Sequence, residues 1–400
     1  MDRIMFANQL LFDAMELSCP HIHETRLEAI LDVSKALQQS RNLSLSAMGK
    51  YLSGNSKIKH KIKKIDRLEG NKHLHNELGE LYKGLSNFVF QYLSHAVSVP
   101  IIVDLCFVKD DRAIQMLSAE VASKGRSIPI YREIFKEGEL SGREQSFLHN
   151  VKECLPDNRE VIVIMDAGFS EAWFKRIESL GWYWVCRIRK GKSIKLNENE
   201  EWISVKDFIP MVEKKTKSYD KAFLMKTHDH SCRLVTTRLS PKGRKVKLSR
   251  GKTTTKLASG SYRNAAKEPW ILASNLPLEY KAAAIVKLYS KRMQIEESFR
   301  DVKSHQFGLS ARYIRTKCIH RWGVKMLLAA IVQITFWVVG IIGHSQGMQK
   351  IFQSNTVKDR KVFSYFTLGK LILEHDKLDL INYNEKSLFD VIQEELARKW

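Results

Sequence analysis

The sequence lacks the features that mark several large classes of protein. Its six cysteines are scattered and form no C-x-x-C pair, which argues against a zinc ribbon or a disulfide scaffold and fits a reducing compartment. It has no G-x-x-x-x-G-K-[ST] motif, so an ATP-driven motor is not indicated. It also has no G-x-S-x-G element that would support a serine hydrolase. No long apolar run follows the first residues, so no targeting signal is visible.

Acidic residues are scarce relative to basic ones. The chain holds 44 Asp and Glu against 66 Lys and Arg, which gives a net charge of +22. This excess predicts a polyanionic partner, namely DNA, RNA or an acidic membrane face. Hydrophobic residues make up 44% of the 400 residues, enough for a sizeable core and two to three domains.

Only one long hydrophobic run is present, at residues 326–342 (MLLAAIVQITFWVVGII). Its 17 residues reach only the lower end of the length that spans a bilayer, and they include Gln333 and Thr335. We therefore expect a buried core helix here, with a membrane anchor as the alternative.

The N-terminal part, residues 1–90, is predicted to be a helical DNA-binding domain. Within it, Arg41–His75 holds nine Lys or Arg against two acids. Ser46–Leu52 and Ser56–Leu68 are expected to form two helices around a turn at Ser53-Gly54-Asn55, with Ser56 as an N-cap. Helix, tight turn and basic helix is the layout of a helix-turn-helix, whose second helix lies in the major groove.

The second of these helices carries the basic side chains that would contact DNA. An ordinary solvated basic face is the alternative for this segment. The candidate DNA-binding residues are Lys57, Lys59, Lys61, Lys63, Lys64 and Arg67, above a buried stripe of Ile58, Ile62 and Ile65.

From residue 95 onward the pattern becomes α/β. Three strand candidates between 100 and 135 are followed by a helix, an apolar strand at Val161–Met165, a second helix and a strand at Trp182–Arg187. This order predicts a sheet with an antiparallel meander and a parallel half. Helix returns at Tyr280–Lys303 and Arg321–Ile342, and 346–400 is expected to be a C-terminal helical region.

Residues 191–277 are polar and basic, with short strand-like stretches, and are predicted to be a β-rich insertion. Its most charged part, Lys242–Lys256, contains seven Lys or Arg and no acid. We interpret it as a mobile loop suited to phosphate contacts, with a merely solvated loop as the alternative. The candidate contacts are Arg244, Lys245, Lys247, Arg250 and Lys252.

Three acids stand on separate elements of the α/β region. Asp104 lies inside an apolar strand, where an unpaired carboxylate is costly; Asp110 and Asp111 nearby fall at an expected turn. Asp166 follows a strand that reads as parallel, at the end where α/β sheets place ligands. Glu296 would share one helix face with Tyr289, Arg292 and Lys303, with an ordinary amphipathic helix that pairs Arg292 with Glu296 as the alternative. Carboxylates on several elements of a basic chain suit Mg²⁺, and two such ions can drive an in-line phosphodiester displacement.

At these residues the sequence resembles a known family. Tyr289, Arg292, Glu296 and Lys303 match, at every interval, the Tyr-(2)-Arg-(3)-Glu-(6)-Lys motif of DDE-type transposases of bacterial insertion sequences. The stretches KHKIKKIDRLEGNKHLH, MDAGF, GWYWVCRIR and KEPWILASNLP are similar to the subgroup that includes the transposase of the tetracycline-resistance composite transposon. Close relatives commonly have Trp and a small polar residue after the first Asp, where this chain has Leu105-Cys106.

The resemblance implies an RNase H-like catalytic core, at 95–190 and 278–345, interrupted by the β-rich insertion. It implies that Asp104, Asp166 and Glu296 are the catalytic triad and the ligands of two Mg²⁺ or Mn²⁺ ions, without ATP. Tyr289, Arg292 and Lys303 would grip phosphates near the cleaved end. Trp270 would stack on a flipped base, with a core tryptophan as the alternative.

The expected function is therefore a cut-and-paste DNA transposase that cleaves transposon ends through a hairpin and joins them to target DNA. Its partners would be inverted-repeat ends and target DNA, bound by at least a dimer in the bacterial cytoplasm and at no membrane. One alternative is an RNase H-like nuclease that cuts without joining. Another is a DNA-binding transposition inhibitor without activity.

Overall fold

The structure is a computed structural model. It describes residues 4–93, 98–123, 125–157, 159–226, 230–238, 246–247, 253–254, 268–306, 308–357, 362–375 and 385–397. The chain divides into two compact units. The first unit comprises Met1–Val161 and Met293–Trp400, and the second comprises Ile162–Arg292. The four-domain division expected from the sequence stays a prediction.

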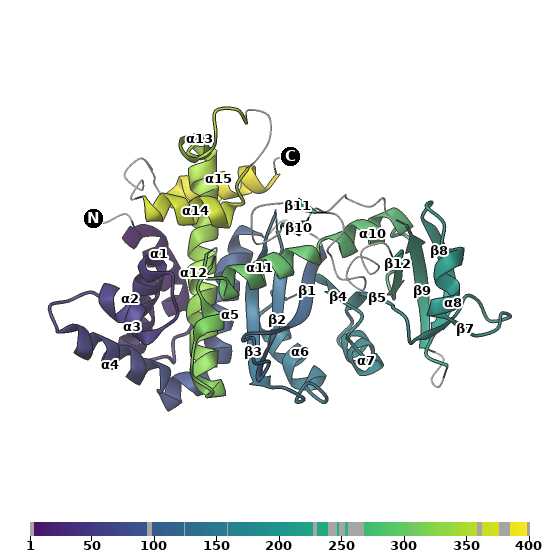
Figure 1. The fold of residues 1–400 in the computed structure, drawn as a ribbon, viewed down its shortest axis with the longest axis horizontal. Helices are drawn as coiled ribbons and strands as arrows, with labels where there is room; N and C mark the ends of the chain where they lie inside the picture. Colours follow the sequence, from purple (N-terminus) through teal and green to yellow (C-terminus); the bar gives the residue numbers. More distant parts are fainter. Residues whose placement is uncertain are drawn as a thin grey trace. The chain divides into compact units, whose positions relative to one another are not determined.

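The first unit begins with five helices, in a segment where the sequence predicts helices. They are α1 (Ile4–Ser18), α2 (Glu24–Ser40), α3 (Leu45–Tyr51), α4 (Ile58–Glu69) and α5 (Lys72–Tyr92). Helices α1 and α2 pack on each other, and α1 also packs along α5 (Figure 1). The apolar residues at three- and four-residue spacing form the buried face, as Leu27, Ile30 and Leu37 of α2 show.

Helices α3 and α4 form the expected helix, turn and helix, with two corrections. The turn is confirmed, because Gly54 adopts a φ of 92°, which favours glycine. The prediction of Ser56 as N-cap was wrong: Lys57 occupies that position, without a side-chain cap. Ile58 is not part of a buried stripe. It is 52% exposed, because it lies in the first turn of α4, beyond the close crossing of Gly49 and Ile62.

A three-stranded antiparallel meander follows, as predicted. Strands β1 (Ser98–Phe107), β2 (Ile114–Ala122) and β3 (Ser127–Lys136) lie in the order β3-β2-β1. Helix α6 (Glu144–Glu153) packs on β3, and α11 (Met293–Lys303) packs on β1 and β3. The short helix η2 (Ala311–Tyr313) comes after α11.

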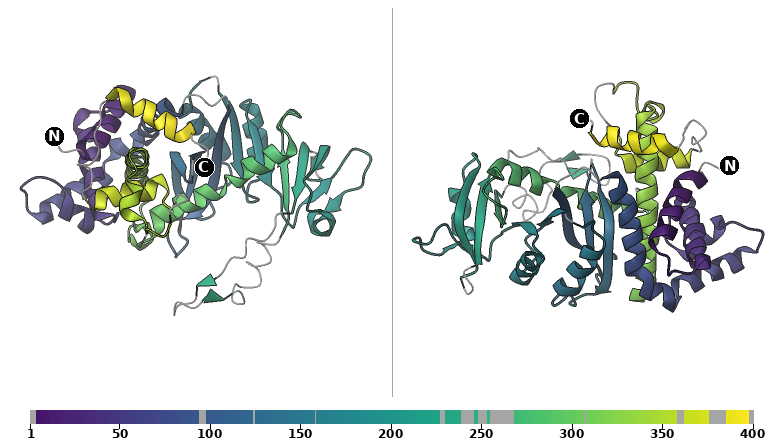
Figure 2. Two further views of the ribbon diagram at one scale, coloured as in Figure 1. Left: turned by 90° about the horizontal axis from the view of Figure 1, so that it is seen from above. Right: turned by 180° about the vertical axis from the view of Figure 1, so that it is seen from behind.

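The centre of the first unit is helix α12 (Ile319–Ser345), which contains the long hydrophobic run. It is the one helix of the described residues that is long and apolar enough to cross a membrane, and its most hydrophobic window is fully buried. It packs against α2, α4, α5 and β3 (Figures 1 and 2). The predicted core helix is therefore present, and it extends three residues beyond Ile342.

Three C-terminal helices complete the first unit: α13 (Gln349–Phe352), α14 (Tyr365–Glu374) and α15 (Glu385–Ala397). Helix α14 crosses α12 at small residues. A Cβ added to Gly340 would lie 1.7 Å from the Tyr365 carbonyl oxygen, and one added to Gly369 would lie 2.0 Å from the Phe336 carbonyl oxygen. This crossing therefore depends on glycine in both helices.

The second unit contains seven strands of one sheet, in the order β4-β5-β12-β9-β8-β6-β7. Strands β4 and β5 are parallel, and the pairs from β5 to β7 are antiparallel. The strands are β4 (Glu160–Met165), β5 (Tyr183–Arg187), β6 (Ser193–Lys195), β7 (Ile203–Ser204), β8 (Lys217–Leu224), β9 (His230–Thr237) and β12 (Trp270–Ser274). The helices are α7 (Glu171–Ser179), α8 (Val205–Phe208), η1 (Ile209–Met211) and α10 (Ala282–Ser290).

The single helix predicted over Tyr280–Lys303 was wrong. Helix α10 ends at Ser290, α11 begins at Met293, and the link is tightened by i→i+3 bonds from Lys291 to Leu288 and from Arg292 to Tyr289. Tyr289 therefore belongs to α10, and Glu296 and Lys303 belong to α11, so the four functional residues do not stand on one continuous helix.

Candidate active site

The parallel pair β4–β5 positions Asp166. Strand β4 (VIVIM at 161–165) is buried along its length, as expected of an internal parallel strand. Its last residue, Met165, pairs with Cys186 of β5, so Asp166 follows directly at the carboxyl end of the strand. Side chains at such ends reach the edge of a parallel sheet where ligands bind.

Three side chains surround the Asp166 carboxylate. The Tyr289 hydroxyl donates to Oδ1 at 3.2 Å. The guanidinium of Arg292 lies 3.9 Å from Oδ2, and that of Arg189 lies 3.6 Å from the same oxygen. The structure thus places Asp166 beside two residues of the Tyr-Arg-Glu-Lys motif, Tyr289 and Arg292, and α10 ends between these two. Their roles stay a prediction.

These neighbours keep Asp166 ionised. Burial alone would raise the pKa of its carboxyl group, but the charge of Arg292, a hydrogen bond from the Ala167 backbone and the charge of Arg189 outweigh burial and lower it. Burial raises the pKa of the Tyr289 hydroxyl, and the negative charge of Asp166 raises it further. Tyr289 therefore stays a neutral phenol that donates a hydrogen bond to a carboxylate.

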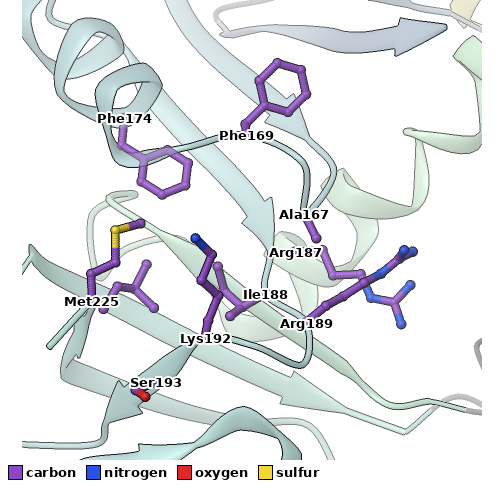
Figure 3. Close-up of a pocket in the computed structure, with 10 residues that line it drawn as sticks. Ala167, Phe169, Phe174, Arg187, Ile188, Arg189, Lys192, Ser193 and Met225 are labelled. Atoms are coloured by element: carbon purple, nitrogen blue, oxygen red, sulfur yellow. The ribbon is translucent and has the colours of Figure 1, made fainter. Parts of the chain in front are cut away.

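Cationic side chains from β5 and the following turn extend this arrangement. Arg187, Arg189 and Lys192 line a crevice beside Ala167 (Figure 3). Its cavity volume is about 10 Å³, room for roughly one water molecule, so it holds no nucleotide. Arg187 is 8% exposed, and its Nε has no hydrogen-bond partner among the residues that the structure describes. These cations form a positive wall next to Asp166.

Arg187, Arg189 and Lys192 are not among the candidate residues that the sequence predicts. The signal was nevertheless present in the stretch CRIRK, because Arg187 is the last residue of the strand that pairs in parallel with β4 and Arg189 follows two residues later. Cations at the carboxyl end of the strand next to an acid-bearing strand belong to the same edge of the sheet.

Trp270 lies beside Tyr289. Their ring centroids are 4.9 Å apart at an angle of 80°, an edge-to-face contact. Trp270 begins β12 and is half-buried, so part of its indole remains accessible. This position is compatible with base stacking, and the choice between that role and a core tryptophan stays a prediction.

In the first unit, Asp104 and Lys303 both lie near Cys106. Asp104 is mid-strand in β1 and half-buried, and its Oδ1 accepts from the Leu105 backbone at 2.8 Å. Lys303 Nζ donates to the Phe107 carbonyl oxygen at 3.3 Å. Burial raises the pKa of the Cys106 thiol to about 12; the charge of Lys303 opposes this rise and that of Asp104 adds to it. The end of α11 therefore meets β1 close to Asp104.

Glu296 lies in the first turn of α11 and is exposed. Asp110 and Asp111, the competing acids, lie in the turn after β1, and Asp110 pairs with Arg312 at 3.0 Å. Asp104 and Glu296 belong to the first unit and Asp166 to the second. The meeting of the three carboxylates at one site stays a prediction.

The donor types suit a hard divalent cation. Asp166 supplies an ionised carboxylate oxygen, the ligand that Mg²⁺ and Mn²⁺ prefer. In the described part of the chain, however, no group of three or more His, Cys, Asp or Glu could hold a metal ion. The metal therefore belongs to the proposal below.

The candidate DNA-binding side chains fall into two groups. On α4 and its N-cap, the six cationic side chains are exposed except that of Lys61, which is half-buried, and Lys64 also pairs with Asp32 at 3.4 Å. In the basic loop, only the backbone of two short paired strands is described, β10 (Val246–Lys247) and β11 (Thr253–Thr254). Arg244, Lys245, Arg250 and Lys252 lie outside the described residues, and so does the side chain of Lys247.

Comparison with known families finds that residues 143–330 match a transposase DDE domain. The matched range contains Asp166, Glu296 and the whole Tyr-Arg-Glu-Lys motif, whereas Asp104 lies before it. Comparison with curated proteins finds no match. The family match supports a DDE-type transposase, and the mixed α/β architecture is compatible with the core of such an enzyme.

Proposed function

We propose that this protein is a cut-and-paste DNA transposase of the DDE type, with an RNase H-like core. The observation that carries the proposal is the ionised Asp166 at the end of β4, in contact with Tyr289 and near Arg292, within a stretch that matches a transposase DDE domain. A carboxylate beside permanently charged guanidinium groups suits phosphodiester chemistry. The carboxylate can bind a metal cation, and the guanidinium groups can bind the negatively charged phosphate of the substrate.

The cations around Asp166 would bind and orient the DNA backbone. Arg292 and Arg189 present planar donors that can grip a phosphate in two-point fashion. The neutral Tyr289 hydroxyl can donate to a phosphate or to Asp166 without adding charge. Lys303 would hold a further phosphate next to β1, and Trp270 would stack on an unpaired base during a hairpin step.

Asp104, Asp166 and Glu296 would hold the divalent metal, with Mg²⁺ or Mn²⁺ as a two-ion pair. When bound, such ions activate a hydroxyl nucleophile and stabilise the leaving oxygen of an in-line displacement. ATP has no role in this scheme, because strand transfer exchanges one phosphodiester bond for another.

The exposed cations of α4 would read the inverted-repeat end from the major groove, as the second helix of a helix-turn-helix does. The basic loop at 242–256 would add phosphate contacts. Pairing two ends before joining them to target DNA calls for at least a dimer, acting in the bacterial cytoplasm and at no membrane.

The test combines cleavage, joining and binding on one DNA end. Asp104→Asn, Asp166→Asn and Glu296→Gln are each expected to abolish Mg²⁺-dependent end cleavage while end binding survives. Asp110→Asn, which alters an exposed acid near Asp104, is the matched control and is expected to cleave normally. Unchanged cleavage in any of the three variants would remove that residue from the triad.

The same assay separates the alternatives. A pre-cleaved end with a free 3′-hydroxyl is joined to a plasmid by a transposase, and it stays unjoined with an RNase H-like nuclease. End binding without cleavage under all metal conditions would indicate a transposition inhibitor and would contradict the proposal.

A further inference from the structure

Helix α11 carries Glu296 and Lys303, and its opposite face is fixed by polar anchors. At 100° per residue, Gln294, Ser298 and Asp301 fall within about 60° of one another. Glu296 and Lys303 lie roughly 140–180° away from them around the helix. One face of α11 thus bears the residues of the proposed function, and the other bears three polar side chains that this function does not use.

Each of the three anchors contacts the β2–β3 hairpin. Gln294 accepts from the Ser123 backbone N–H at 3.1 Å and donates to the Ser123 carbonyl at 2.7 Å. Asp301 pairs with Arg126 at 2.8 Å. Ser298 accepts from Arg132 Nη2 at 3.5 Å. The contacts are spread over two turns of the helix, so together they fix both its rotation and its position along its axis.

The central anchor belongs to a buried polar network. The side chains of Arg132 and Glu120 are fully buried and lie 2.9 Å apart. Ser118 and Ser127 donate to the two oxygens of Glu120 at 2.9 and 2.6 Å. On the other side, Gln333 of α12 donates to Ser298 Oγ at 3.1 Å. Two strands and two helices therefore share one hydrogen-bonded cluster.

A gain in folding stability does not explain why such a network is buried. A buried ion pair costs desolvation energy, and apolar residues of similar volume are often at least as stabilising. Hydrogen bonds do, however, specify one geometry, which apolar packing does less strictly. Only one rotation of α11 satisfies Ser298, Gln294 and Asp301 together, and that rotation sets the direction of Glu296.

We infer that Gln294, Ser298 and Asp301 are positioning residues, whose contacts with the β2–β3 hairpin hold α11 in the one rotation that presents Glu296 and Lys303 for catalysis. The inference rests on the proposed function, because it concerns how that site is held in place. A residue that orients a metal ligand typically contributes 10–100-fold to metal affinity or activity. Loosening α11 should therefore act on metal dependence and leave DNA binding intact.

The experiment measures end cleavage by the full-length protein against Mg²⁺ and Mn²⁺ concentration, with metal-free end binding and thermal unfolding measured in parallel. Ser298→Ala and Gln294→Ala each remove one anchor without adding volume. Both are expected to raise the half-saturating Mg²⁺ concentration about tenfold and to leave end binding unchanged. The double variant is expected to need a higher half-saturating Mg²⁺ concentration than either single variant.

Ile30→Val in α2 is the stability control. It removes one methyl group from a fully buried side chain far from α11 in the sequence and costs about 1 kcal/mol. Its metal dependence should equal that of the unaltered protein. If it reproduces the shift, or if the anchor variants keep a normal metal dependence, the inference is overturned while the proposed function stands. If the unaltered protein cleaves no ends, both fall together.

Discussion

At the scale of single residues, opposite environments give the acids opposite protonation behaviour. Asp166 has cationic neighbours that outweigh burial, so its pKa lies below the ordinary value. Asp301 is more deeply enclosed; burial raises its pKa to about 6, although Arg126 opposes the rise. Asp166 is therefore charged throughout the neutral and mildly acidic range, whereas Asp301 gains its charge only near pH 6.

Asp301 should make the folded state less stable as pH rises. Its pKa of about 6 in the folded protein exceeds the unfolded value of about 3.9, so the folded chain binds this proton more tightly. The resulting stabilisation is present below pH 3.9 and is lost as pH rises through 6. It amounts to at most about 3 kcal/mol for two pKa units.

The measurement is the thermal midpoint of Asp301→Asn and of the unaltered protein between pH 4 and 8. We expect the thermal midpoint of the variant to fall less between pH 4 and 6 than that of the unaltered protein, because the asparagine side chain does not titrate. The comparison must be made as a difference, because burial also raises the pKa of Glu69 and Glu133. If the thermal midpoints of the two proteins change with pH in parallel, Asp301 does not have the raised pKa.

At the scale of elements, buried charge joins the α3–α4 pair to α12. Lys325 of α12 is 2% exposed and donates to the Leu43 carbonyl at 2.8 Å and to the carboxylate of Glu69 at the end of α4. Burial lowers the pKa of Lys325 and raises that of Glu69, while their mutual attraction opposes both changes. The pair is therefore sensitive to the loss of either partner.

Lys325→Met should destabilise the protein by about 3–5 kcal/mol, because it leaves the buried Glu69 with only the more distant Arg321 guanidinium, at 4.0 Å, as a cation. Combining it with Glu69→Met removes both charges and should recover most of that loss. Denaturant unfolding of the three proteins checks this. A double variant as unstable as Lys325→Met would show that packing, and not the stranded charge, dominates.

The crossing of α12 and α14 makes a second prediction. Gly340→Ala should destabilise by at least about 1–3 kcal/mol, because its Cβ would overlap the Tyr365 carbonyl oxygen. Gly79→Ala in α5 is the matched control: no atom lies within 4 Å of its added Cβ, so it should stabilise by about 1 kcal/mol. The two substitutions are expected to change the free energy of unfolding in opposite directions. Equal changes would contradict the close crossing of α12 and α14.

The sequence predicts these elements unevenly, for physical reasons. Apolar runs such as Val161–Met165 specify strands locally, and the meander, the parallel pair and the core helix are where we expect them. The break after Ser290 carries no glycine or proline signal. Gln294 and Ser298 were missed because their partners, Ser123 and Arg132, lie more than 160 residues away in the chain.

The candidate site shows the same division. The spacing of Tyr289, Arg292 and Glu296 is a local pattern, so it could be recognised in the sequence. Arg187 becomes interpretable only once β5 is known to lie parallel to β4. What depends on pairing of distant segments had to come from the structure.

At the scale of the whole molecule, the net charge of +22 predicts how DNA binding responds to salt. Each phosphate contact releases about 0.9 counterion, so affinity should fall steeply with ionic strength. Lys59→Ala and Lys63→Ala, both on α4, should each reduce the slope of log K against log [salt] by about 0.9.

Lys83→Ala is the control, because this lysine lies on α5 and pairs with Glu153 of α6, away from the proposed DNA-binding helix. Titration of an end fragment at several salt concentrations measures the slope for the three variants and for the unaltered protein. If α4 contacts the backbone, only its two variants change the slope. A slope near zero in the unaltered protein would argue against a DNA partner altogether.

The central position of α12 also affects how the protein folds during its synthesis. The ribosome adds about 5–20 residues per second, so roughly 13–50 s pass between the completion of α5 at Tyr92 and that of α12 at Ser345. Throughout that interval α4 has its partners α2 and α3 but lacks its contacts with α12. The segment proposed to bind DNA therefore completes its packing only once the chain has been made as far as Ser345.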